Sequence, residues 1–166
     1  VDSLPDADAP CAVYIAQDGS LGVAWEQGVT VLTPMEAAHN QKLLDSSLKR
    51  DADVLLLDIE DSVPITEKQT ARDNIKEFVK RNDLNGKLIF PRVNDRESGE
   101  LLKDAYQLTI DGVHGFMYPK ATKGEDIYFF GKLLETIEYA NSFHIRPSFY
   151  LFTLYYLFNQ TSKCFP

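Results

Sequence analysis

The stretch that decides the fold is DVLLLDIEDSVPITEKQTARDN, Asp53 to Asn74. Its apolar run, Val54 to Leu57, is followed by three closely spaced acids, Asp58, Glu60 and Asp61. A short apolar run bounded by polar residues predicts a strand that is buried on both faces, as in a parallel sheet. Carboxylates at the C-terminal end of such a strand lie where α/β folds place their active sites. The stretch therefore predicts a βα unit with a candidate site at its turn.

The same acids also have a purely structural interpretation, because acidic residues are common in loops and at helix caps. Asp61 or Ser62 could cap a helix, and Thr66 followed by Gln69 fits a capping box. Caps would account for only one or two of the three acids. Residue chemistry alone leaves the functional and the structural interpretation open.

The next two predicted strands also end in polar side chains. LIFPRVND, Leu88 to Asp95, delivers Arg92 and Asn94 at its C-terminal end, and GVHGFMYPK, Gly112 to Lys120, delivers Lys120. Three successive strands thus end in acid, guanidinium and ammonium groups. We expect the three strands to lie side by side and parallel, with Glu60, Arg92 and Lys120 at one end of the sheet.

Taken together, DIEDSV, PRVN and YPK resemble the ordered motifs of the citrate lyase β-subunit family, also called the HpcH/HpaI aldolase-like lyases. The resemblance runs from about Val29 to Pro147. It implies a (β/α)8 TIM barrel that cleaves or forms a carbon–carbon bond next to a carboxylate. The implied substrate is an acyl-CoA or a 2-oxo or 2-hydroxy acid, such as citryl-CoA or malyl-CoA, and the implied cofactor is Mg2+.

The resemblance also implies roles for individual residues. Glu60 and Asp61 match the acids that line the catalytic site in the family. Arg92 matches the arginine that grips the substrate carboxylate, Asn94 belongs to the same motif, and Lys120 matches a lysine with a positioning role. These assignments are expectations that come from the family pattern.

The sequence departs from that pattern in two places. No arginine falls at the end of the first strand, whether its turn is aligned at Pro34 or at Ala37. The glutamate that binds magnesium in the family is replaced by Tyr150, counting from Pro147, and the second metal ligand would lie beyond Pro166. No metal ligand is therefore predicted in this chain, although the family implies magnesium.

The predicted organisation has three parts. Residues 1–27 are an acidic arm and a β-hairpin, CAVYIA and LGVAW joined by an Asp-Gly turn, outside the family pattern. Residues 28–147 are a partial barrel of about four βα units, and residues 148–166 are an aromatic-rich tail. The tail is interpreted as an aromatic partner-binding stripe, as a buried strand or helix, or as aberrant sequence from read-through of non-coding sequence or from a frameshift. Helical and strand periodicity give the barrel elements as strands 29–32, 54–58, 88–93 and 115–118 and helices 37–50, 65–82, 96–109 and 123–141.

Length and charge limit the remaining possibilities. The chain has 166 residues, whereas a complete barrel has ~250, so we expect about half of the fold. With 25 acidic and 17 basic residues, the net charge of −8 disfavours nucleic-acid and anionic-membrane partners. The absence of a signal peptide and the two separated cysteines indicate the cytoplasm, or the mitochondrial matrix. An open half-barrel would expose strand edges, so we expect a homo-oligomer.

Two hypotheses follow from these observations. The first is the N-terminal half of a magnesium-dependent carbon–carbon lyase that is inactive as this fragment. The second is a catalytically dead remnant that acts as a binding or assembly module. His39, His114 and His144 are scattered without a second ligand at metal spacing, so we interpret them as core or capping residues.

Overall fold

The computed structural model describes residues 12–15, 21–25, 28–32, 36–81, 84, 86–141 and 150–152. For residues 12–15, 21–25, 28–32 and 150–152 it describes the backbone alone. Within this part of the chain the strands form one sheet in the order β1-β2-β3-β5-β6-β7-β8, and β4 also pairs with β5. The strands are β1 Ala12–Ile15, β2 Leu21–Trp25, β3 Gly28–Leu32, β4 Glu36–Ala37, β5 Val54–Asp58, β6 Leu88–Arg92, β7 Gly115–Met117 and β8 Tyr150–Phe152.

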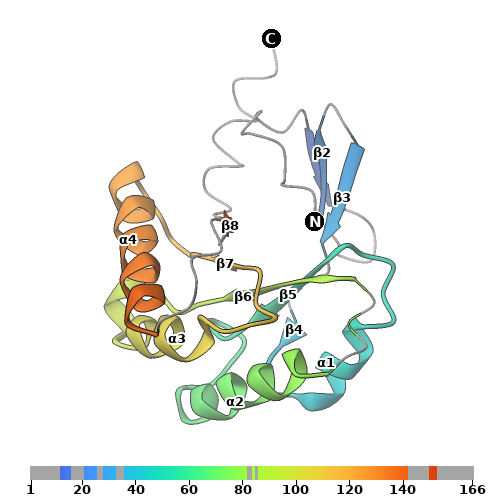
Figure 1. Ribbon diagram of the computed structural model, residues 1–166. Helices are drawn as coiled ribbons and strands as arrows, with labels where there is room; N and C mark the ends of the chain where they lie inside the picture. The colour runs from blue at the N-terminus through green and yellow to red at the C-terminus, as the bar shows by residue number, and fades with distance from the viewer. Residues whose placement is uncertain are drawn as a thin grey trace.

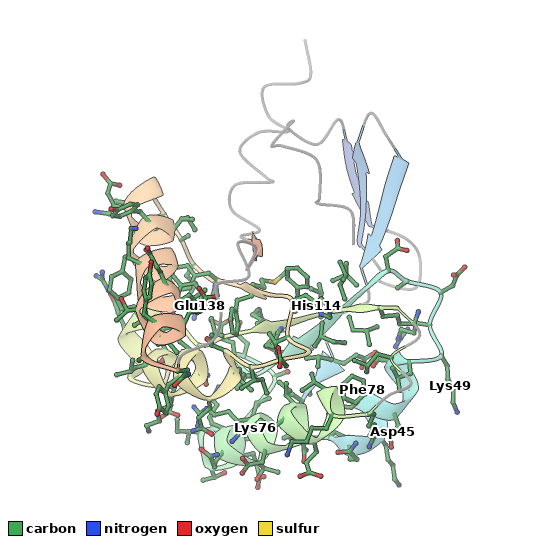
Figure 2. The ribbon with its side chains drawn as sticks, in the orientation of Figure 1. Asp45, Lys49, Lys76, Phe78, His114 and Glu138 are labelled. Atoms are coloured by element: carbon green, nitrogen blue, oxygen red, sulfur yellow. The ribbon has the colours of Figure 1, made fainter. Side chains whose placement is uncertain are left out.

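The helices lie on the same side of this sheet (Figure 1). They are α1 Gln41–Ser47, α2 Lys68–Val79, α3 Leu101–Leu108 and α4 Gly124–Ala140, with short 3-10 turns at η1 Ile65–Glu67 and η2 Arg96–Ser98. Each helix connects consecutive strands, which is the βα order that produces a parallel sheet. Figure 2 shows Phe78 between the helices and the strands, where it is fully buried.

The centre of the sheet is the parallel group β5, β6 and β7, as predicted from their apolar runs. All five residues of β5 and all three of β7 are buried. Strand β6 pairs with β5 along its whole length and with β7 through Arg92 and Met117. Strands that are buried on both faces need apolar side chains in succession, which explains the unbroken runs in the sequence.

The predicted N-terminal hairpin is confirmed, and it belongs to the same sheet. Strand β1 pairs antiparallel with β2, and β2 pairs antiparallel with β3. Strand β3 then runs parallel to β5, so the hairpin extends the sheet beyond the first predicted barrel strand. The two-residue strand β4 also runs parallel to β5, at its C-terminal half. The sequence does not predict β4, because two residues are too few to show a period.

All four predicted helices are longer than the observed ones, and for two of them the structure shows why. The predicted helix 37–50 begins only at Gln41, because β4 precedes it and the Asn40 side chain caps it by accepting from the N–H of Lys42. The predicted helix 96–109 is split by Gly99, whose φ of 75° ends the η2 turn before α3 starts. The capping box at Thr66 and Gln69 is wrong, because α2 has Glu67 at its N-cap and no side-chain cap.

The described strands and helices establish an α/β architecture of successive βα units. This order corresponds to the first units of the predicted barrel, whose closure stays a prediction. The acidic arm before Ala12 and the tail after Phe152 lie outside the described residues, so their interpretations also stay predictions. In the described part of the chain, no helix has the length and apolar character required to span a bilayer.

Candidate functional site

The polar ends of β5, β6 and β7 meet at one end of the sheet. Asp58, the last residue of β5, is in register with Arg92, the last residue of β6. Arg92 in turn is in register with Met117, the last residue of β7. Side chains at and after these positions converge, so that Glu60 lies within ion-pair distance of both Arg92 and Lys120.

Arg92 is held along one edge by Asp58. Its Nε and Nη2 each donate to one oxygen of Asp58, both at 2.8 Å. Asp58 is fully buried and Arg92 is only partly exposed. This two-point contact fixes the plane of the guanidinium group, and Nη1 at its other end is directed toward Glu60 and Asp61.

The Asp58 carboxylate also organises the loop that follows β5. It accepts hydrogen bonds from the backbone N–H of Glu60 at 2.8 Å and of Ser62 at 3.0 Å, and from the Ser62 hydroxyl. Burial alone would raise the pKa of Asp58, but the hydrogen bonds from Arg92 and Ser62 and the charge of Arg92 outweigh it and hold that pKa below its ordinary value. Asp58 is therefore ionised, and its donors stabilise the anion.

Glu60 lies between the two cations of the site. Its Oε2 is 3.1 Å from Arg92 Nη1, and its Oε1 is 2.8 Å from Lys120 Nζ. Glu60 is 5% exposed. The Lys120 contact is an ion pair that places the ammonium charge directly beside Oε1. A buried carboxylate beside two cations can accept a hydrogen bond, and then the proton, from a bound hydroxyl group.

Lys120 reaches the site from a strained backbone position. Its φ of 54° is in the left-handed region, which non-glycine residues adopt rarely. The contact with Glu60 and, as the second largest cause, the contact with Asp95 raise the pKa of Lys120 well above its ordinary value. The Nζ atom donates to Asp95 at 2.9 Å, and this contact lowers the pKa of the Asp95 carboxyl. Strain of this kind is found at positions where the surrounding contacts fix a functional side chain.

Asp61 forms the outer rim of the site. It is 3.6 Å from Arg92 Nη1 and 3.9 Å from Lys120 Nζ, and its side chain is 66% exposed. Exposed ion pairs at such distances contribute little and are screened by salt. Of the acids around Arg92, Asp61 is therefore the one that an incoming anion can displace most readily.

Asn94 does not point toward the cations. Its backbone N–H and its Nδ2 both donate to Asp104 Oδ2 at 2.7 Å, and the residue is 2% exposed. The structure thus brings Glu60, Asp61, Arg92 and Lys120 together and places the Asn94 amide in a buried network with α3.

The described residues do not fit a magnesium site. They contain no group of three or more histidine, cysteine, aspartate or glutamate side chains that could hold a metal ion. The acids near Arg92 are already matched with guanidinium and ammonium groups, whereas Mg2+ requires oxygen ligands in an octahedral arrangement. Tyr150, which stands at the expected glutamate position, begins β8 and is in register with Gly115.

The described histidines have structural positions. Nδ1 of His114 accepts from the N–H of Ile89, and its backbone N–H donates to the carbonyl of Ile89. His39 follows β4, and its carbonyl accepts from Asn74 Nδ2 at 3.1 Å. Neither lies among the residues around Arg92 that carry the site's ion pairs. His144 is outside the described residues.

Sequence reasoning does not assign separate roles to Asp58 and Asp95. Asp58 is one of three neighbouring acids, but its partner Arg92 lies 34 residues away and no local pattern names it. The shared strand-end position of Asp58 and Arg92 is the signal that could have paired them. Asp95 directly follows the R-V-N motif, so it could have been included with the polar residues at that strand end.

Comparison with known proteins places most of the chain in one family. Residues 36–146 match the model of the HpcH/HpaI aldolase/citrate lyase family, which is more than half of the chain. The chain is 35% identical over 92 residues to the L-malyl-CoA/beta-methylmalyl-CoA lyase of Rhodobacter capsulatus, and the same figures hold for that lyase from a named strain of the same bacterium. The alignment covers 54% of this chain and 29% of the relative. The chain therefore spans less than a third of the length of these lyases.

Proposed function

Since this chain belongs to the HpcH/HpaI aldolase/citrate lyase family, we propose that it carries the carboxylate-binding part of a carbon–carbon lyase site. The observation that supports this most directly is the orientation of Arg92 by Asp58. That contact uses one edge of the guanidinium group and leaves Nη1 beside Glu60, at 3.1 Å, and beside the more displaceable carboxylate of Asp61, at 3.6 Å. A substrate carboxylate has the same charge and shape as the carboxylate that it would replace.

The proposed substrate class rests on the family and on the charges of the site. The similar enzyme from Rhodobacter is named for malyl-CoA and β-methylmalyl-CoA. We propose an acyl-CoA of this kind, with a free carboxylate next to a hydroxyl-bearing or oxo-bearing carbon. The carboxylate would bind Arg92, and Lys120 at the exposed side would contact the adjacent oxygen.

The residues of the site suit an aldol-type cleavage. Glu60 would take the proton from the substrate hydroxyl, and the electron pair of the O–H bond would form the carbonyl of one product. The carbon–carbon bond would break, and its electron pair would pass to the thioester carbonyl as an enolate that a proton then quenches. Positive charge from Arg92 and Lys120 would stabilise the anionic species. Magnesium stays an expectation from the family, and no step here requires it of the described residues.

A second candidate is a binding or assembly module without turnover. It is favoured by the internal pairing of the cations, since Arg92 pairs with Asp58 and Glu60, and Lys120 pairs with Glu60 and Asp95. Ion pairs that are all made within the chain could stabilise the fold without binding any ligand. The two candidates differ in whether an external carboxylate can enter the set.

The proposal is tested by calorimetric titration of the chain with L-malyl-CoA and with butyryl-CoA, which lacks the free carboxylate. We expect L-malyl-CoA to bind more tightly and the difference to shrink as salt is added, because the contact is ionic. Equal affinities for the two thioesters would overturn the proposal and favour the packing interpretation.

A further inference from the structure

Two cationic side chains of helix α2, those of Lys68 and Arg72, are buried on the side of the helix that packs against the core. Lys68 is 8% exposed and Arg72 is 2% exposed, although lysine and arginine are almost never fully buried unless they are paired. The two residues are four positions apart and therefore lie on one face of the helix, together with the buried Ala71 and Ile75. Charges on the core face of a helix require specific partners, because burial without them is costly.

The partners of Lys68 are the backbone carbonyls of the loop that carries Glu60. Its Nζ donates to Ile59 O at 2.6 Å and to Glu60 O at 2.7 Å. Burial lowers the pKa of Lys68, and the nearby charges of Asp104 and Asp58 act in the opposite direction. An ammonium group with two carbonyl acceptors fixes the point where the chain leaves β5.

The partners of Arg72 lead to the loop after β6. Its Nε donates to Asp104 Oδ1 at 2.7 Å, and it also pairs with Glu100. The second oxygen of Asp104 accepts both donors of Asn94. Arg72 therefore holds, through Asp104, the residue that stands two positions after Arg92.

We propose that Lys68 and Arg72 are positioning residues, which set the loops after β5 and β6 so that Glu60 faces the fork of Arg92. Neither makes any of the ion pairs described for Arg92 or Lys120, and both act through a loop backbone or through Asp104. The distance that they would control is the 3.1 Å between Arg92 Nη1 and Glu60 Oε2. The proposal concerns the same site as the proposed lyase function and rests on that function for its ligand.

The first test compares Lys68→Met with Lys76→Met in the whole chain. Lys76 is on the same helix but pairs with Asp73 and Gln107, away from the loop, and Figure 2 labels it at α2. The first measurement is the Nε–Hε resonance of Arg92 by NMR, a signature of its bond to Asp58. We expect Lys68→Met to shift or broaden this resonance although Lys68 does not touch Arg92, and Lys76→Met to leave it unchanged.

The second measurement is the affinity for L-malyl-CoA, compared with that for butyryl-CoA. Lys68→Met removes both carbonyl contacts of Lys68 and should weaken L-malyl-CoA binding about tenfold, as expected if the displaced loop costs the ligand one charge-assisted contact. It should leave butyryl-CoA binding unchanged. An unchanged Arg92 resonance with unchanged affinity would overturn the proposal, and so would equal effects of the two lysine substitutions.

A third variant keeps the proposal testable if Lys68→Met does not fold. Asp104→Asn keeps the size of the side chain but cannot accept from both Arg72 and Asn94 as a carboxylate does. It should shift the Nδ2 resonances of Asn94 and the Nε–Hε resonance of Arg92 together. A shift at Asn94 with Arg92 unaffected would contradict the positioning role. If the wild-type chain binds no thioester, the lyase proposal fails. The NMR measurements on Lys68→Met and Asp104→Asn still decide, independently of ligand binding, whether Lys68 and Arg72 position Arg92.

Discussion

Arg92 and Asp58 are in register as the last residues of two neighbouring parallel strands, and their side chains meet in a two-point contact of 2.8 Å at each oxygen. The contact is buried on the Asp58 side and partly open on the Arg92 side, where the side chain is 14% exposed. It therefore has an anchored end and an end that solvent reaches. A guanidinium group held in this way is preorganised for a second carboxylate, which lowers the entropic cost of binding.

The first prediction concerns the acid stability of this pair. Since the pKa of Asp58 is lowered in the folded protein, its ionised form contributes stability above its ordinary pKa of 3.8, and that contribution is lost as the pH falls through the folded-state pKa. Asp58→Asn should cost about 2 kcal/mol at pH 7, less than the usual ~3–5 for a broken buried pair, because Glu60 still pairs with Arg92. Urea unfolding measured from pH 7 to pH 3 should show that the free energies of unfolding of the wild type and of Asp58→Asn approach each other as the pH falls. A constant difference over that range would contradict the prediction.

The sequence was sufficient to predict the central strands and the meeting of their ends. The apolar runs of β5, β6 and β7 are largely buried on both faces, so the pattern reports the packing directly. The strand β4 and the interruption at Gly99 were missed, because each depends on one or two residues. The joining of the hairpin to β3 also could not be predicted, since pairing partners are set by the whole sheet.

For the candidate site, the sequence predicts which residue types stand at the strand ends and on the helix face. It does not predict which groups their side chains contact. Lys68 and Arg72 fall on the apolar face of α2 by helical spacing, and a charge on that face is a signal of a buried contact. Which carbonyls and carboxylates they meet depends on segments up to 32 residues away. Asn94 shows the same limit, because its motif predicted a ligand contact while its amide is bound to Asp104.

The second prediction compares two glycines with positive φ. A Cβ on Gly112, whose φ is 89°, would lie 2.9 Å from Cβ of Val79, whereas a Cβ on Gly99, whose φ is 75°, would meet nothing within 4 Å. Gly99→Ala should cost about 1–2 kcal/mol from the backbone conformation alone. Gly112→Ala should cost about 1–3 kcal/mol more, because the turn must move away from α2. Chemical denaturation measures both, and equal costs would show that the turn adapts freely.

The third prediction concerns self-association. In the described part of the chain, β1 and β8 are the two end strands of the sheet order. Backbone groups along an uncovered end strand pair readily with another chain. We expect light scattering to report dimers or larger species at micromolar concentration. A monodisperse monomer with sharp cooperative unfolding would contradict this prediction.

The fourth prediction concerns turnover with magnesium. We expect no detectable Mg2+-dependent cleavage of L-malyl-CoA by residues 1–166, because Tyr150 stands at the expected metal-ligand position and the described acids are paired with cations. A Lewis acid at an enolate contributes several kcal/mol, and its loss lowers the rate by orders of magnitude. Cleavage that EDTA abolishes, and that Arg92→Lys also abolishes, would show that the chain does hold a metal site.

The measurement that most directly tests the carboxylate-binding role of Arg92 is thioester binding by Arg92→Lys. Lysine keeps a positive charge beside Asp58, so the fold should persist by circular dichroism, but it lacks the planar fork that matches a carboxylate. Calorimetry should show L-malyl-CoA bound about tenfold or more weakly by the variant, with butyryl-CoA unchanged, as expected for a lost charge-assisted contact. A variant that binds both thioesters as the wild type does would contradict the proposed role of Arg92.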